Sequence, residues 1–261
     1  MNVCLTLDLE PDHASRAPTA YDGWEPARVS ELLRLLERHR APLTVFVVGQ
    51  HLPARPETID LLRRHGAEFH LHSYSHDLAH PDTQDEIQLG VEAFARVFGR
   101  RPAGYRAPEG RISKAGWRRL EQEGFVFDSS IFPSFWPAPR YLRYRPEPFH
   151  PLGTRLLEFP ISTLGPARLI VSLSWFKLLG WGLYRRLLAR GRLPEPLVFD
   201  MHLHDLWHVP SYDLLPQPWR TIYRRGQGRG LEVLGCFLEL LAGRGARFTT
   251  LGERARERLA A

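Results

Sequence analysis

Short hydrophobic runs alternate along the chain with amphipathic segments in which apolar residues recur at helical spacing. The hydrophobic runs predict strands near residues 3–9, 43–48, 67–71, 104–106, 125–127, 156–159, 197–203 and 247–251. The helical pattern falls near residues 27–40, 56–65, 84–98, 113–123 and 231–241. Repeated alternation of strand and helix favours a parallel sheet, open or closed into a barrel, that helices cover.

Polar residues with catalytic potential stand at the ends of these predicted strands. They are Asp8 and Glu10 at the first strand, His72 and His76 after the third, and then Arg106, Asp128, His202 and His204. Barrel enzymes keep their chemistry at the carboxyl ends of parallel strands, which all meet on one face. We therefore expect these side chains to converge.

Two carboxylates and two imidazoles in this set are spaced to share a metal. Asp8 and Glu10 are two residues apart on a strand, so both project toward one side. His72 and His76 are four residues apart and can lie on one face of a helical turn. A carboxylate with two histidines leaves metal positions open for water and substrate. One carboxylate would hold the metal while the other takes a proton from water.

Each of these residues also has a simpler explanation when it is taken alone. Strand-end acids can cap a helix or pair with arginine, single histidines are usually core or surface groups, and Asp128-Ser129-Ser130 fits an ordinary helix cap. The sequence contains no Gly-x-Ser-x-Gly elbow and no phosphate-binding glycine loop. The combination therefore favours a metal-assisted hydrolase over an enzyme with a nucleophilic side chain.

Five segments, in order, resemble the five motifs of the polysaccharide deacetylases (NodB-like, carbohydrate esterase family four). They are Thr6–Glu10, His72–His76, Arg106–Gly110, Asp128–Ser130 and His202–Asp205, and together they stretch over about 200 residues. The histidine segment and the Arg-x-Pro segment are the specific ones. The resemblance implies a distorted (β/α)7 barrel of the NodB-like type, with residues 1–261 as a single catalytic domain.

The resemblance also implies a metal site and a catalytic base. His72 and His76 correspond to the metal-binding histidines, and Asp8 corresponds to the base. Leu9 occupies the usual position of the metal-binding aspartate, so the acidic ligand shifts to Glu10. This Asp-x-Glu form resembles a branch of the family with unusual substrates, at least one group of which works without metal. The implied metal is zinc, with cobalt or nickel as alternatives.

Further roles follow from the remaining motifs. Arg106 would brace the base, Pro108 would shape the substrate groove, and Asp128 and Trp207 are further substrate-binding candidates. Aromatic residues that could stack on sugar rings are Phe135, Trp136, Tyr141, Trp207 and Trp219.

The general acid that protonates the leaving amine is predicted to be a histidine tuned by a carboxylate. His202 and His204 alternate onto one face of their strand, and Asp205 follows them. Strand phase favours His202, as in the Asp-x-Glu branch, whereas the pair His204-Asp205 fits the commoner family pattern. We favour His202.

Composition narrows the class of protein but not the fold. Hydrophobic residues make up 43% of the chain and charged residues 25%, which is typical of a globular protein. The net charge of +6 rests mostly on arginine and favours anionic partners, but the arginines are scattered, which disfavours a nucleic-acid binder. Cys4 and Cys236 are too few for a disulfide framework. No signal peptide or long apolar run is recognised, so the predicted location is cytoplasmic.

An aromatic and basic segment near residues 166–193 is an apparent insertion. It contains Trp175, Lys177, Trp181 and Arg185-Arg186. One interpretation is a barrel helix with an apolar face. The other is an interfacial segment that approaches a lipid-linked sugar at the inner face of a membrane, where its basic residues meet phosphate.

The predicted function is that of a metal-dependent hydrolase, which removes an N-acetyl or N-formyl group from an amino sugar. The expected substrate is a glycan or cell-envelope precursor, with lipid-linked and nucleotide-linked forms as candidates. A metal-independent amidohydrolase on a small cyclic amide is an alternative, which Leu9 favours and the intact histidines disfavour. A non-catalytic glycan- or lipid-binding protein is the other alternative, which the retained Asp8 and histidines disfavour.

Overall fold

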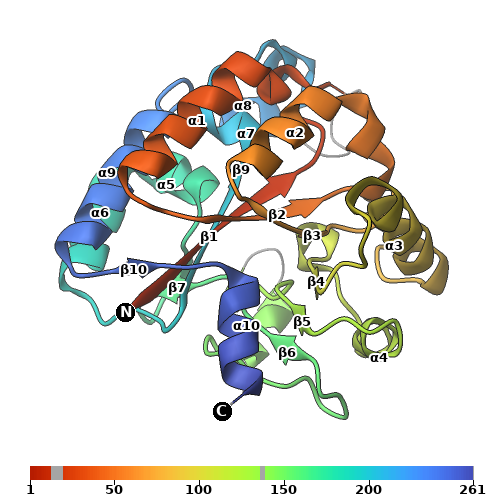
Figure 1. Cartoon of the computed structure of the whole chain (residues 1–261). Helices are drawn as coiled ribbons and strands as arrows, with labels where there is room; N and C mark the ends of the chain where they lie inside the picture. The colour runs from red at the N-terminus through yellow and green to blue at the C-terminus, as the bar shows by residue number, and fades with distance from the viewer. Residues whose placement is uncertain (13–19, 136–138, 261) are drawn as a thin grey trace.

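In the computed structural model, residues 1–12, 20–135 and 139–260 are described, and a curved parallel sheet surrounded by helices forms their centre (Figure 1). The strands are β1 (Asn2–Leu9), β2 (Leu43–Val47), β3 (Glu68–Leu71), β4 (Gly104–Tyr105), β5 (Phe127–Asp128), β6 (Leu157–Glu158), β7 (Thr163–Leu164), β8 (Leu169–Ile170), β9 (Leu197–His202) and β10 (Arg247–Phe248). Each predicted strand is present, and several of them are shorter than predicted.

The α-helices are α1 (Pro26–Arg38), α2 (Pro56–Arg64), α3 (Gln84–Phe98), α4 (Lys114–Gln122), α5 (Leu173–Leu179), α6 (Trp181–Arg190), α7 (Leu203–Leu206), α8 (Trp219–Arg224), α9 (Gly230–Gly243) and α10 (Leu251–Leu259). Short 3-10 helices are η2 (Asp22–Trp24), η3 (Gly49–Ala54), η4 (Pro108–Gly110), η5 (Pro139–Arg143) and η6 (Pro210–Leu214). None of the helices within the described ranges is long and apolar enough to cross a membrane.

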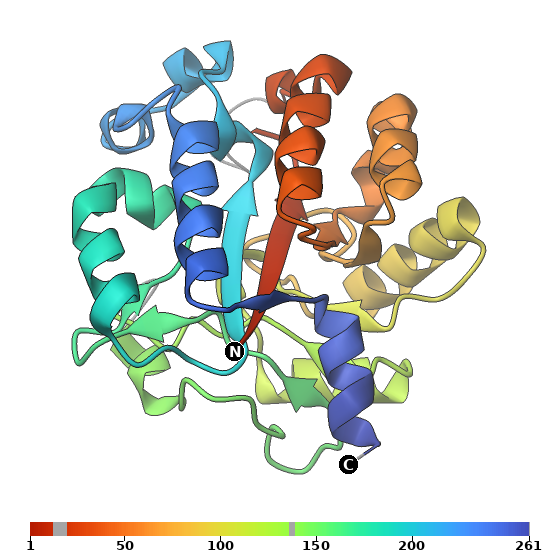
Figure 2. The same cartoon turned by 60° about the vertical axis from the view of Figure 1, so that its left-hand side comes forward.

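The sheet is an incomplete barrel of parallel strands in the order β9-β1-β2-β3-β4-β5-β6, and β10 pairs with the first residues of β1. Figure 2 shows β9 and β1 side by side at the centre. Between the two ends of this order, the backbone N–H of Ser162 donates to the carbonyl oxygen of Val198 at 3.0 Å, and that of Asp200 donates to Val171 at 3.3 Å. These hydrogen bonds connect the segment that follows β6 with strand β9. The predicted distorted (β/α)7 barrel is confirmed.

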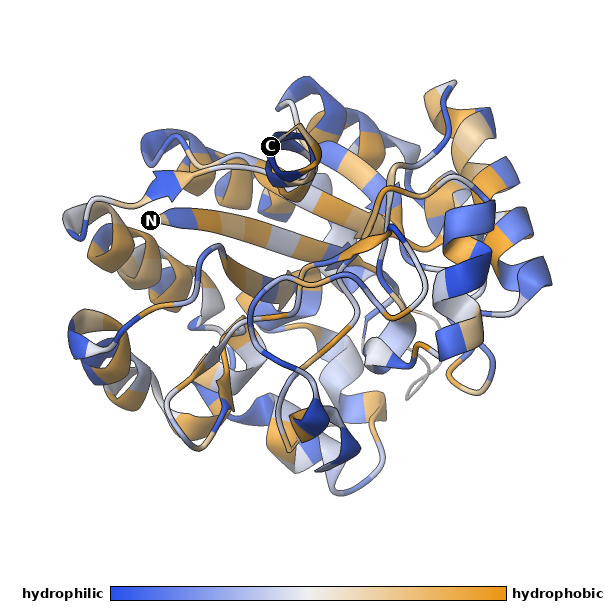
Figure 3. Cartoon of the chain, turned by 90° about the horizontal axis from the view of Figure 1, so that it is seen from below, coloured by the Kyte–Doolittle hydropathy of each residue, from blue (hydrophilic) through white to orange (hydrophobic). Residues whose placement is uncertain are grey.

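Alternation along β1 explains why the barrel interior becomes polar toward one end. Leu5, Leu7 and Leu9 belong to the main hydrophobic core together with the buried face of α1. Seen from below, β1 is mostly hydrophobic, while the surrounding helices have both hydrophobic and hydrophilic residues (Figure 3). Cys4 points the other way, into a second core that α10 closes, and Thr6 and Asp8 follow it on the same side.

The segment near residues 166–193 folds as the β7–β8 hairpin and two helices rather than one. Gly180, with a φ of 95°, separates α5 from α6. Phe176 of α5 and Tyr184 and Leu188 of α6 are buried in the main core. Lys177 is also buried, and its partner belongs to the site described below.

The start of α9 is packed directly against α7. A Cβ added at Gly230 would collide with the carbonyl oxygen of Asp205 and would lie 2.6 Å from the Cα of Leu206. Both neighbours are backbone atoms that cannot rotate away. We expect Gly230→Ala to lower the free energy of unfolding by about 1–3 kcal/mol, measured by urea denaturation.

Gly243, the last residue of α9, is the matched control because a Cβ there would meet nothing within 4 Å. Gly243→Ala should leave stability unchanged or raise it by up to about 1 kcal/mol. Equal destabilisation by the two substitutions would show that the contact with α7 does not require glycine at position 230.

Candidate active site

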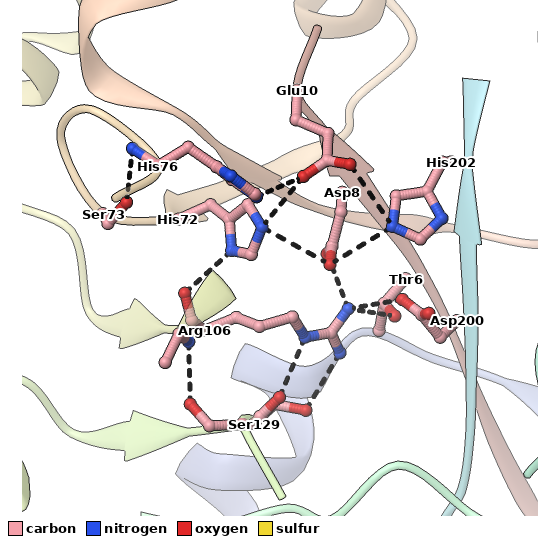
Figure 4. A network of polar contacts seen from close by, with 12 residues as sticks. Thr6, Asp8, Glu10, His72, Ser73, His76, Arg106, Ser129, Asp200 and His202 are labelled. Atoms are coloured by element: carbon pink, nitrogen blue, oxygen red, sulfur yellow. Dashed lines mark hydrogen bonds and ion pairs between the residues drawn. The ribbon is translucent and has the colours of Figure 1, made fainter. Parts of the chain in front are cut away.

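A cavity of about 240 Å³ opens at the carboxyl ends of β1, β3 and β9. The structure brings most of the predicted site residues to this cavity, namely Asp8, Glu10, His72, His76, Arg106, His202 and Asp205. Figure 4 draws the contacts among these residues, apart from those of Asp205. The convergence follows from the parallel sheet, whose strands all end on this face.

Glu10, His72 and His76 form a compact buried cluster. Oε2 of Glu10 lies 2.5 Å from Nε2 of His76 and 3.5 Å from Nε2 of His72. The potential ligand atoms of the three residues all lie within 4.8 Å of one another. One carboxylate and two imidazoles are the donors of many catalytic zinc sites, which keep a further position open. The residues present therefore fit a divalent metal.

The loop that carries His76 is not the helical turn that the spacing predicts. His72 directly follows β3. The chain then turns at Ser73 and His76, whose φ angles are 59° and 62°. Glu86, in the first turn of α3, accepts hydrogen bonds from the backbone N–H of Ser75 at 2.9 Å and from its hydroxyl at 2.6 Å. The expectation of a helix was wrong because this tertiary anchor, and not local helical hydrogen bonding, holds the loop.

His72 is oriented by the strand beside it. Its Nδ1 lies 2.8 Å from the carbonyl oxygen of Arg106, so Nδ1 carries the hydrogen and donates it. Nε2 is therefore the ring nitrogen that faces Glu10 and is placed to act as a ligand. A second hydrogen bond of this kind is common for histidines that bind metals, since it fixes the tautomer and the direction of the ring.

Asp8 is held from below by Arg106. The guanidinium donates from Nη1 to Oδ1 of Asp8 at 2.7 Å, to Oδ1 of Asp200 at 2.9 Å and to the hydroxyl of Thr6 at 2.8 Å. Oδ2 of Asp8 instead lies 3.7 Å from Nε2 of His72. One oxygen of Asp8 is therefore fixed by the arginine while the other faces the metal cluster, as the predicted bracing role requires.

His202 and His204 take different positions. Nε2 of His202 lies 3.7 Å from Oε1 of Glu10 and 4.0 Å from Oδ2 of Asp8, and the ring lines the cavity. The ring of His204 is stacked on that of His202 with centroids 5.0 Å apart, and it is not among the cavity-lining residues. The geometry favours His202 as the histidine that meets a substrate.

Asp205 supports His202 and is itself supported by the insertion. Its Oδ2 lies 3.1 Å from Nδ1 of His202 and accepts a hydrogen bond from the hydroxyl of Ser174 at 2.7 Å. The ammonium of Lys177 forms an ion pair with Oδ1 of Asp205 at 2.9 Å and donates a hydrogen bond to the backbone carbonyl oxygen of Asp205 at 2.9 Å. His202, His204 and Asp205 also lie close enough to share an ion, but the ammonium of Lys177 already provides the cation for Asp205.

The buried charges shift one another's proton affinities. Burial by itself would raise the pKa of Glu10, but His76, His72 and His202 hold it well below its usual range. Burial by itself would lower the pKa of His202, but Asp205, Glu10 and Asp200 raise it to about 10. Burial together with Asp8 raises the pKa of Asp200 to about 6, against the opposing effect of His202 and Arg106. At neutral pH, Glu10 is therefore ionised and His202 protonated.

Three predicted substrate contacts do not reach the cavity. Pro108 is buried in η4, and its neighbours Ala107 and Glu109 line the cavity instead. Trp207 packs against the main core. Asp128 is fully buried and accepts hydrogen bonds from the indole of Trp117 and the hydroxyl of Ser130. Its position is structural because it lies at the end of the very short β5, below the cavity lining.

Other lining residues escaped the sequence reasoning or were assigned no role. They are Ser174, Trp175, Lys177 and Leu178 of α5, Ile222 and Tyr223 of α8, Asp200 of β9, and the loop residues Phe132, Ser172 and Arg225. Trp219, a stacking candidate, lines the cavity, whereas Trp136 lies outside the described residues. Among these residues, only Asp200 could have been predicted from the sequence. It lies two residues before His202 on the same strand, so both side chains point into the barrel.

Asp128 and Glu158 form a buried pair of carboxyl groups beneath the site. Glu158 on β6 is adjacent to Asp128 on β5, and its Oε1 accepts the backbone N–H of Ile131 at 2.9 Å. Burial and the charge of Asp128 raise the pKa of Glu158 well above its usual range, and burial raises that of Asp128. The pair is therefore most stable when it retains a proton.

We expect this proton to make the fold less stable as pH rises. The pKa of Glu158 is higher in the folded state than its unfolded value of about 4.3. The stability that the proton contributes is therefore fully present below about pH 4.3, and it is lost as the pH rises toward the folded pKa. The slope is at most about 1.4 kcal/mol per pH unit for one proton. Glu158→Gln keeps the acceptor and removes the titration, so urea denaturation between pH 5 and 8 should show a smaller loss than in the wild type. Parallel pH profiles of the two proteins would contradict the shared proton.

A parallel barrel with this strand order belongs to the NodB-like class of folds. The crystal structure of a protein from Mycobacterium smegmatis, described as a polysaccharide deacetylase, superposes with a TM-score of 0.62 and 21% identity, over 99% of this chain and 90% of that one. PuuE allantoinase superposes with a TM-score of 0.60 and 18% identity, over 100% of this chain and 90% of that one. At these identities the likeness concerns the fold.

Sequence comparison adds a match over part of the chain. Residues 6–127, a little under half of the chain, match the polysaccharide deacetylase family. The peptidoglycan deacetylase-like protein FGM2 of Gibberella zeae is 31% identical over 109 residues, which are 40% of this chain and 32% of that protein. The chain also spans less than half the length of two further curated deacetylases that it matches.

Proposed function

We propose that the protein is a metal-dependent hydrolase that removes an N-acetyl or N-formyl group from an amino sugar of a glycan or cell-envelope precursor. The observation that carries the proposal is the arrangement of three units around one cavity. These are the cluster of Glu10, His72 and His76, the Asp8 carboxylate held by Arg106, and the imidazole of His202 held by Asp205. Each unit has the residue types that amide hydrolysis requires.

Glu10, His72 and His76 would hold the divalent cation, and zinc matches these donors. When bound, such an ion supplies Lewis acidity, which polarises an amide carbonyl and lowers the pKa of water. Burial of all three ligands excludes bulk water from this side of the cavity. The converging donors also support this proposal over a metal-independent amidohydrolase on a cyclic amide.

Asp8 would act as the general base. The water oxygen forms a bond to the amide carbon while Oδ2 of Asp8 takes the proton from that water. Arg106 holds Oδ1 and so keeps Oδ2 directed toward the cavity. A positioned base of this kind typically contributes a factor of about 10²–10⁴ in rate.

His202 would act as the general acid. Its Nδ1 is bound to Asp205, so its protonated Nε2 faces the cavity and can donate to the amine nitrogen as the carbon–nitrogen bond breaks. The products are acetate, or formate, and the free amino sugar. Acetate release from a panel of N-acetylated glycan fragments and sugar precursors tests the proposal. A folded, metal-loaded protein that releases no acyl group from any of them would support the non-catalytic binding alternative.

We expect His72→Ala and Glu10→Ala to lose bound metal. The wild type purified without chelator should hold about one equivalent of zinc or cobalt by elemental analysis, and both variants should hold close to none, because each loses one of three ligands. His80→Ala is the control, since its side chain is 73% exposed and outside the cluster. Metal content in His72→Ala equal to that of the wild type would contradict the assigned ligands.

We expect Asp8→Asn to separate catalysis from metal binding. The variant keeps the shape of the side chain but cannot accept the proton, so kcat should fall by about 10²–10⁴ while metal content is unchanged. Asp60→Asn is the matched control because that carboxylate is on the surface. Turnover within tenfold of the wild type in Asp8→Asn would exclude Asp8 as the base.

A further inference from the structure

One wall of the cavity is built from apolar side chains of α5 and α8. Trp175 and Leu178 of α5, and Trp219, Ile222 and Tyr223 of α8, line the cavity and are half-buried. We call these five residues the α5–α8 wall. A cavity of about 240 Å³ is larger than an acetyl group and one water require, since an ordered water needs on the order of 10–15 Å³ by the same measure.

The α5–α8 wall lies on the His202 side of the cavity. Ser174 and Lys177 of α5 both contact Asp205, which holds His202. The ring of Tyr223 lies 5.7 Å from that of His204, which is stacked on His202. Figure 1 shows α5, α7 and α8 on the flank of β9, whereas β3, which leads to the metal histidines, lies on the other flank. The wall therefore faces the side from which the leaving amine is protonated.

Resting on the proposed function, we propose that the α5–α8 wall binds an apolar chain attached to the amino sugar, as its aglycone, and not the acyl group that is removed. The sugar carries the leaving amine, so the groups attached to the sugar extend toward His202 and the wall. Aromatic rings alone would also suit the faces of a sugar polymer. The aliphatic side chains of Leu178 and Ile222 offer no such stacking, and burial of methylene groups is the interaction that they favour.

Substitutions in α8 test the wall without removing a core residue, because α8 contains no buried side chain. Ile222→Asn places a polar group in the cavity lining. Thr221→Asn is the matched control, since Thr221 is exposed on the same helix and does not line the cavity. Thermal unfolding of both variants verifies that each is folded before it is compared.

The experiment compares methyl, butyl and octyl glycosides of N-acetylglucosamine, below the concentration at which the octyl compound forms micelles. Acetate release gives kcat/KM, and calorimetric titration with octyl glucoside, which has no amide, gives binding without turnover. We expect kcat/KM to rise by up to about fourfold for each added methylene until the cavity is filled. Ile222→Asn should lower the ratio of octyl to methyl kcat/KM about tenfold, while Thr221→Asn leaves it unchanged.

Two further substrates locate the apolar chain. An N-octanoyl methyl glycoside carries the chain on the acyl side, and an N-acetylated disaccharide replaces the chain by a second sugar. A gain with either that equals the octyl gain, or equal kcat/KM for methyl and octyl glycosides, would overturn the proposal. If no glycoside is hydrolysed but octyl glucoside binds and Ile222→Asn abolishes binding, the wall is supported and the proposed function fails for these substrates.

Discussion

The rest of the site depends on the contacts that the buried guanidinium of Arg106 makes. The side chain of Arg106 is 1% exposed, yet it reaches residues of β1 and β9 and the carbonyl oxygen of Ser129 beyond β5. Its charge lies 4.2 Å from the centre of the Phe46 ring, which closes the space below it. A buried cation is tolerated only when its donors are satisfied. The barrel interior must therefore keep carboxylates next to Arg106. These are Asp8, the proposed base, and Asp200.

Strand phase made much of this site predictable. Alternation alone predicts that Asp8 and Glu10 lie on one side of a strand. The structure agrees, with Leu9 in the core that lies against the helices. The prediction of His202 over His204 combined strand phase with the resemblance to the Asp-x-Glu branch, and the His202 ring lines the cavity. Local sequence suffices here because the period of a strand is fixed by covalent geometry.

Other predictions from the sequence were wrong because tertiary contacts decide the structure at those positions. The spacing of His72 and His76 suggested a helical turn, but Glu86 of α3 stabilises an irregular loop that no local pattern encodes. Asp128 matched a motif whose position suggested the substrate groove, and it instead shares a buried layer with Glu158. Lys177 was read as part of a basic segment, although its ammonium is a buried partner of Asp205. In each case, the partner belongs to a different element of the fold, so no local pattern predicts the contact.

The anchoring of the three proposed ligands is unequal. Glu10 directly follows β1 and His72 directly follows β3, so the central sheet carries both. His76 belongs to a loop that two peripheral elements hold, through Glu86 of α3 and through Gly49 and Gln50 of η3. Fraying of the first turn of α3 together with η3 would release this loop while the sheet stays intact. The exchange kinetics of an ion at this site would then be governed by the opening of these peripheral helix ends, at a rate independent of global unfolding.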